Sequence, residues 1–113
     1  MTKIQINEKI LKVLDSEIKF DYPIEKAELF KDKIIILLDS DSNLRAWGQF
    51  PNLYGVDFKG KILWLAELPT TDTGDSYHSF SLTDKGIKAY AASSYECIID
   101  PLTGKIMEKI FTK

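Results

Sequence analysis

The sequence has 113 residues, 44% hydrophobic and 28% charged, which suits one globular domain with a single core. Fifteen basic and seventeen acidic residues give a net charge of -2, so no overall attraction for nucleic acid is expected. The apolar stretches are too short for a membrane-spanning helix and the start lacks a signal-peptide pattern, so we expect a cytoplasmic protein. One cysteine, Cys97, and one histidine, His78, offer neither a disulfide nor a zinc site, and we expect no metal and no cofactor.

Residues 1–22 are expected to form an N-terminal β-hairpin that turns at residues 7–9. Ile4 and Ile6 alternate with polar residues, as in a half-buried strand, and β-branched residues are frequent throughout the chain. A helix is the alternative that this pattern leaves open. Its apolar face would consist of Ile10, Leu11, Val13, Leu14 and Ile18.

Residues 23–66 and 76–111 each contain four short apolar or alternating stretches separated by turn residues. This pattern is typical of antiparallel strands joined by tight turns. Each segment is therefore predicted to be a four-stranded meander. We expect residues 1–113 to form a single all-β domain, either a small sandwich or an open propeller fragment.

The two four-stranded units share a turn motif. "VDFKGKIL" (56–63) parallels "IDPLTGKIM" (99–107), and their glycines, Gly60 and Gly104, are 44 residues apart, close to the period of propeller blades. "LYGVDFKGKILW" and "CIIDPLTGKIMEK" resemble the last two strands of quinoprotein-type propeller blades, in which an Asp-x-x-Gly-Lys turn recurs. Two units are too few to close a ring, and no residues match a quinone-cofactor pocket.

The chain as a whole is similar to small bacterial β proteins, through "WGQFPNLYGVDFKGKILW" and "IDPLTGKIMEKIFTK". Some of these resemble immunity proteins of toxin systems, including contact-dependent growth inhibition. The resemblance implies a non-enzymatic protein that binds and neutralises a toxin. It transfers no catalytic residues to this chain.

The stretch "DSDSNLRAWGQF" (39–50) begins like a calcium loop but does not continue as one. Asp39, Asp41 and Asn43 have the spacing of an EF-hand, yet the sixth position is Leu44 instead of glycine and the twelfth is Phe50 instead of glutamate. Without the sharp turn and the closing carboxylate, calcium coordination is not expected. We predict a turn capped by its own side chains.

His78, the one histidine of the sequence, gives little support for a catalytic function. Ser76 and His78 share one face of a predicted strand while Ser79 points to the other, so these residues do not converge as a catalytic triad. The chain also lacks the glycine-flanked serine of hydrolases and the phosphate-binding glycine loop. No catalytic residue is predicted, although a hydrolase using His78 remains an alternative.

Charge is predicted to be divided between the two ends of the sheets. In a meander alternate connections share an end, so the lysine-rich short turns should lie opposite the long acidic loops 39–52 and 67–75. Long loops on a rigid sheet often carry binding residues, and Trp and Arg are enriched in interfaces. The predicted partner-binding residues are Asp39, Asp41, Arg45, Trp47, Phe50, Glu67, Asp72 and Asp75.

This acidic surface predicts a basic protein partner, possibly a nuclease toxin domain, because the substrate groove of a nuclease is cationic. We expect the protein to act as a monomer. The alternative is a small-molecule or glycan binding protein with a cleft between its sheets.

Overall fold

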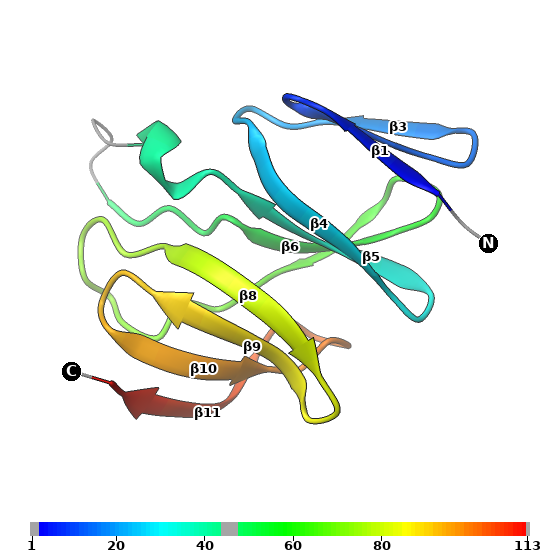
Figure 1. The fold of residues 1–113 in the computed structure, drawn as a ribbon. Helices are drawn as coiled ribbons and strands as arrows, with labels where there is room; N and C mark the ends of the chain where they lie inside the picture. Colours follow the sequence, from blue (N-terminus) through cyan, green and yellow to red (C-terminus); the bar gives the residue numbers. More distant parts are fainter. Residues whose placement is uncertain (1–2, 44–47, 113) are drawn as a thin grey trace.

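The computed structural model describes residues 3–43 and 48–112 and shows an all-β protein (Figure 1). Its regular elements are eleven strands and one short 3₁₀ helix, η1 (Ser40–Asn43). The strands are β1 (Ile4–Asn7), β2 (Ile10–Val13), β3 (Ser16–Lys19), β4 (Ile24–Phe30), β5 (Lys33–Leu38), β6 (Leu53–Asp57), β7 (Ile62–Leu65), β8 (Tyr77–Thr83), β9 (Gly86–Ala91), β10 (Tyr95–Ile99) and β11 (Ile106–Phe111).

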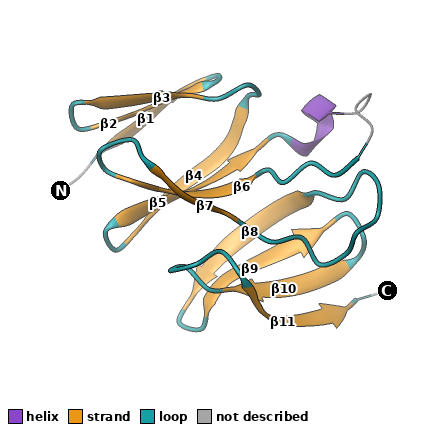
Figure 2. Ribbon diagram, turned by 180° about the vertical axis from the view of Figure 1, so that it is seen from behind, coloured by secondary structure: helices purple, strands orange, loops and turns teal. Residues whose placement is uncertain are grey.

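The strands form three antiparallel sheets packed face to face, with sheet B in the middle (Figures 1 and 2). Sheet A contains β1, β2 and β3; sheet B contains β4 to β7; sheet C contains β8 to β11. Each sheet is a meander of consecutive strands. The two predicted four-stranded units and their sandwich arrangement are therefore confirmed.

The N-terminal segment is a three-stranded sheet, one strand more than the predicted hairpin, and the alternative helix does not form. A second turn at Leu14 and Asp15 joins β2 to β3, with Val13 opposite Ser16. Leu14 adopts a positive φ of 52°, a conformation that leucine rarely takes. The sequence did not predict this turn because Asp15 alone is a typical turn residue and the positive φ falls on Leu14.

Two hydrophobic cores lie on the two faces of sheet B, and β5 contributes to both. All six residues of β5 are buried. Ile35 and Leu37 pack into the core shared with sheet C, whereas Ile34, Ile36 and Leu38 pack into the core shared with sheet A. The continuous apolar run "IIILL" therefore reflects a central strand covered on both faces.

Trp64 of β7 is buried between two glycines, Gly55 and Gly104. Its indole N–H donates to the carbonyl of Pro101, 2.9 Å away, in the turn between β10 and β11. A Cβ added at Gly104, in that turn, would lie 2.7 Å from the Trp64 ring, and one at Gly55 would overlap the ring. The two glycines thus leave the space that the indole fills.

Asn52 connects sheet B to sheet C. Its side-chain amide is fully buried and donates to the carbonyls of Leu38 and Tyr77, each 2.8 Å away. Its amide oxygen accepts the N–H of Tyr77, also at 2.8 Å. One side chain therefore holds the end of β5 against the start of β8.

Candidate functional site

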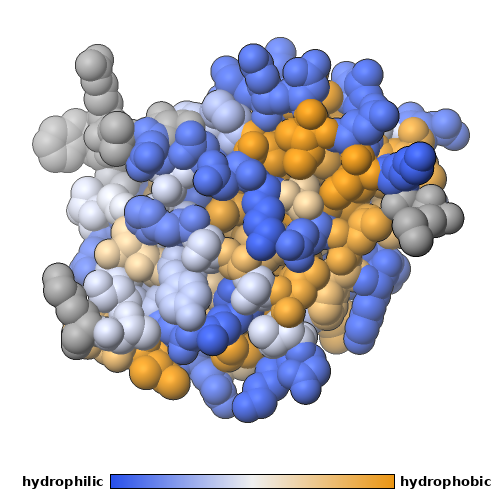
Figure 3. All heavy atoms as spheres, viewed as in Figure 1, coloured by the Kyte–Doolittle hydropathy of each residue, from blue (hydrophilic) through white to orange (hydrophobic). Residues whose placement is uncertain are grey.

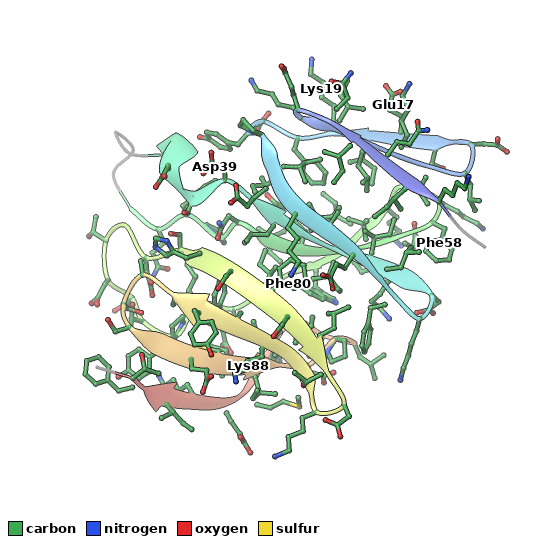
Figure 4. The ribbon with its side chains drawn as sticks, in the orientation of Figure 1. Glu17, Lys19, Asp39, Phe58, Phe80 and Lys88 are labelled. Carbon is green, nitrogen blue, oxygen red and sulfur yellow. The ribbon has the colours of Figure 1, made fainter. Side chains whose placement is uncertain are left out.

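Asp39 and Asp41 follow directly after β5 and are held by a local cap. The carboxylate of Asp39 accepts the backbone N–H of Asp41 at 3.0 Å, at the start of η1. The backbone N–H of Asp39 donates to the carbonyl of Pro23, 2.9 Å away, which fixes the turn to the start of β4. Asp41 is exposed and Asp39 half-buried at the surface (Figure 4). This is the self-capped turn that the sequence predicted.

The second long loop lies against the first. The amide of Gln49 donates to the carbonyls of Thr70 and Asp72, and the N–H of Gly74 donates to the carbonyl of Gly48 at 2.8 Å. Asp72 is exposed beside these contacts. We call the surface formed by Asp39, Asp41 and Asp72 the acidic end.

Asp75 does not belong to this surface, contrary to prediction. Its side chain is only 2% exposed. The carboxylate accepts hydrogen bonds from the hydroxyl of Thr70 at 2.7 Å, the N–H of Ser76 at 3.0 Å and both the N–H and the hydroxyl of Ser93. Asp75 therefore holds its loop to the turn between β9 and β10. A carboxylate with this many internal donors has no need of a partner.

Phe50 is also buried and is not displayed at the surface, as a residue predicted to contact a partner should be. It is 8% exposed and belongs to the core between sheets A and B. Its ring meets that of Tyr22 edge to face, with the ring centroids 4.9 Å apart. Phe50 closes the end of this core, because removing its apolar ring from water stabilises the folded protein.

Glu67 is exposed but lies away from the acidic end. Its N–H donates to the carbonyl of Gly104 and its carboxylate accepts the N–H of Ile106 at 3.0 Å. The chain crosses to sheet C immediately after the short strand β7, so Glu67 contacts the β10–β11 turn. Only the later part of loop 67–75 reaches the acidic end, which the simple alternation of meander ends did not predict.

Arg45 and Trp47 fall outside the described residues, and their predicted roles in partner binding remain predictions.

The possible reactive groups are dispersed. His78 is exposed, and its Nδ1 lies 3.5 Å from the Ser40 hydroxyl, at the limit of a hydrogen bond. Burial raises the pKa of the Cys97 thiol, which disfavours the reactive thiolate. Within residues 3–43 and 48–112, no three His, Cys, Asp or Glu side chains gather in a metal-binding group. No helix in this part of the chain is long and apolar enough to cross a membrane.

Together, these features define a small all-β domain with two tied loops that display carboxylates. The sequence of residues 1–111 matches the family described as "Domain of unknown function (DUF7957)", so the chain belongs to that family. No curated protein sequence is significantly similar to it. Its fold is similar to the crystal structure of the computationally designed Ika8 protein, with 10% sequence identity and a TM-score of 0.65. The similarity covers 99% of this chain and 33% of the designed chain, and it concerns the fold alone.

Proposed function

We propose that this domain is a non-enzymatic protein-binding module that presents its acidic end to a basic protein partner. One observation carries the proposal: the loop that bears Asp39 and Asp41 and the loop that bears Asp72 are joined by the hydrogen bonds of Gly48 and Gln49 to residues 70–74. Among the described residues, none of the three carboxylates takes part in an ion pair. Their charge is therefore available to an incoming cation.

Buried hydrogen bonds hold the two loops in place, so a partner would meet a preformed surface. Asn52 and Asp75 hold the bases of the two loops by buried hydrogen bonds, so the acidic end needs little ordering when a partner binds. Surface charge of one sign also speeds encounter with a partner of opposite charge. The proposed partner is a toxin with a cationic surface, such as a nuclease domain, and the proposed role is that of an immunity protein in the cytoplasm.

The small-molecule alternative has less support. A cleft between sheets B and C would have to occupy the space that Ile35, Leu37, Tyr77 and Ile99 fill, and each of these side chains is at most 2% exposed. A ligand site there would require the core to separate. Binding at the surface loops is the better fit to this packing.

The test is neutralisation of a toxin. The protein encoded next to this chain's own gene is purified, and its nuclease activity is measured while this chain is added in increasing amounts. We expect inhibition that is complete at one chain per toxin, because an immunity protein binds its toxin tightly and stoichiometrically. Full activity in the presence of a large excess of the chain would contradict the proposed role.

A further inference from the structure

Sheet A is one strand narrower than the two sheets that follow it, and this leaves part of sheet B uncovered. Leu65 lies opposite Tyr54 and Ile62 opposite Val56, so the register places both on the face of sheet B that packs against sheet A. Both side chains are nevertheless 45% exposed. The outer strand β7 thus carries apolar side chains that no strand of sheet A covers.

A pocket of about 170 Å³ lies beside Ile62 and beside Tyr54, the residue opposite Leu65. The end of β3 and the link to β4 form one wall with Lys19, Phe20, Asp21 and Tyr22, and sheet B forms the other with Leu38, Tyr54 and Ile62. We call this pocket, together with the exposed Leu65, the β3–β7 groove. Figure 2 shows β3 and β7 as the outer strands of their sheets on the same side of the molecule.

The free edge of β3 offers backbone hydrogen bonds along this groove. The N–H of Phe20 donates to the carbonyl of Lys9, on the β2 side of β3. Because alternate residues of a strand direct their backbone groups to opposite sides, Glu17 and Lys19 direct theirs toward the open side. Within the described chain, β3 pairs only with β2.

The outer strand β4, by contrast, is in contact with sheet C. On β4, Lys26 and Glu28 form an ion pair, and Lys26 also covers the ring of Phe80 and donates to its carbonyl at 2.7 Å. Lys26 therefore connects the edge of β4 to β8 of sheet C and obstructs the approach of another strand. Figure 3 also shows apolar surface over β4 and its neighbours. At the edge of β4, however, the contact between Lys26 and Phe80 obstructs a further strand.

The side chains of β3 indicate the chemistry of a matching strand. Glu17 and Lys19 are exposed on the outer face of sheet A (Figure 4), whereas Ile18 and Phe20 face the core. A strand antiparallel to β3 would place a cation opposite Glu17, an anion opposite Lys19 and apolar residues at the alternate positions. Those apolar residues would cover Ile62 and Leu65.

We propose that the β3–β7 groove binds an extended segment of another protein, which adds to sheet A as a fourth strand antiparallel to β3. Main-chain hydrogen bonds with Glu17 and Lys19 supply affinity, and the apolar strip of β7 together with the charges of β3 selects the sequence. This inference is independent of the acidic end and of any toxin.

The experiment uses the parent protein and a labelled synthetic peptide, Thr-Val-Glu-Val-Lys-Val-Thr, whose binding is followed by fluorescence anisotropy. One matched derivative is N-methylated at its Glu and Lys, whose N–H groups would point toward β3. The other is N-methylated at two of its valines, whose N–H groups would point away. We expect the first derivative to bind at least tenfold more weakly than the second, because only the first loses bonds to the edge.

Protein variants locate the site. Leu65→Lys should weaken binding of the parent peptide at least tenfold, whereas Ile6→Lys, at a 44% exposed position on β1, should leave it unchanged. Equal binding of the two methylated peptides, or no binding of the parent peptide at about 1 mM, would overturn the proposal. A dimer of the protein that Leu65→Lys dissociates would also overturn it, in favour of a second copy as the occupant.

Discussion

At the scale of single residues, the contact between Trp64 and Gly104 makes the most specific demand on the sequence. Gly104 has a φ of 76°, which side-chain-bearing residues rarely adopt, and its missing Cβ leaves room for the indole. Gly74 has a similar φ of 81° but nothing within 4 Å of its Cβ position. A substitution at Gly74 therefore tests backbone strain alone, whereas one at Gly104 tests backbone strain together with steric overlap with Trp64.

We expect Gly74→Ala to cost about 1 kcal/mol in unfolding free energy, from backbone strain alone. Gly104→Ala should cost about 2–4 kcal/mol, because the added methyl group must also displace Trp64. Urea denaturation of the two variants and the parent measures both values. Equal losses for the two alanines would show that the Trp64 ring moves aside without cost.

At the scale of elements, Asn52 joins sheets B and C. In the described chain, no strand of sheet B pairs with a strand of sheet C. The amide of Asn52 satisfies the carbonyls of Leu38 and Tyr77 and the N–H of Tyr77 in a buried environment. Asn52→Ala should therefore lower the unfolding free energy by about 2–4 kcal/mol, since buried backbone groups would lose their partners.

Asn52→Asp provides the sharper comparison, because a carboxylate can still accept from Tyr77 but cannot donate to either carbonyl. It should destabilise the protein at least as much as alanine does. Asn7→Ala, at an exposed position, serves as the control and should change stability by less than about 0.5 kcal/mol. A stable Asn52→Asp variant would mean that the two sheets are held together by the core alone.

Strands with tight polar or glycine-containing turns were predictable because periodicity and turn chemistry agreed, as in the turns before Lys61 and Lys105. The β2–β3 turn was not predicted, because its positive φ falls on Leu14, a residue type that rarely takes this conformation, and Asp15 is its one turn-forming residue. Sequence pattern thus predicts a turn only where the residue types suit the backbone conformation that the turn requires.

At the scale of the whole molecule, the acidic end was predictable only in part. Asp39, Asp41 and Asp72 lie at the loop surface as their chain positions indicated. Asp75 and Glu67 have the same side-chain chemistry, but their places depend on Ser93 and Ile106, residues distant in sequence. A single sequence gives no sign of such pairings. It therefore does not distinguish an acidic loop residue that makes internal hydrogen bonds from one that is free to bind a partner.

The acidic end is the surface that we propose meets a basic partner. The most direct measurement is the association rate of this chain with the proposed toxin partner, by stopped flow at several salt concentrations. The double variant Asp39→Lys and Asp41→Lys is compared with a control, Asp15→Lys and Asp84→Lys, which makes the same charge change at exposed residues in other turns.

We predict that the acidic-end variant associates about tenfold or more slowly at low salt and loses most of the salt dependence, because opposed charges chiefly set the rate of encounter. The control variant should remain close to the parent. Circular dichroism must first show that both variants are folded. Association of the acidic-end variant at the parent's rate, with the parent's salt dependence, would contradict the account.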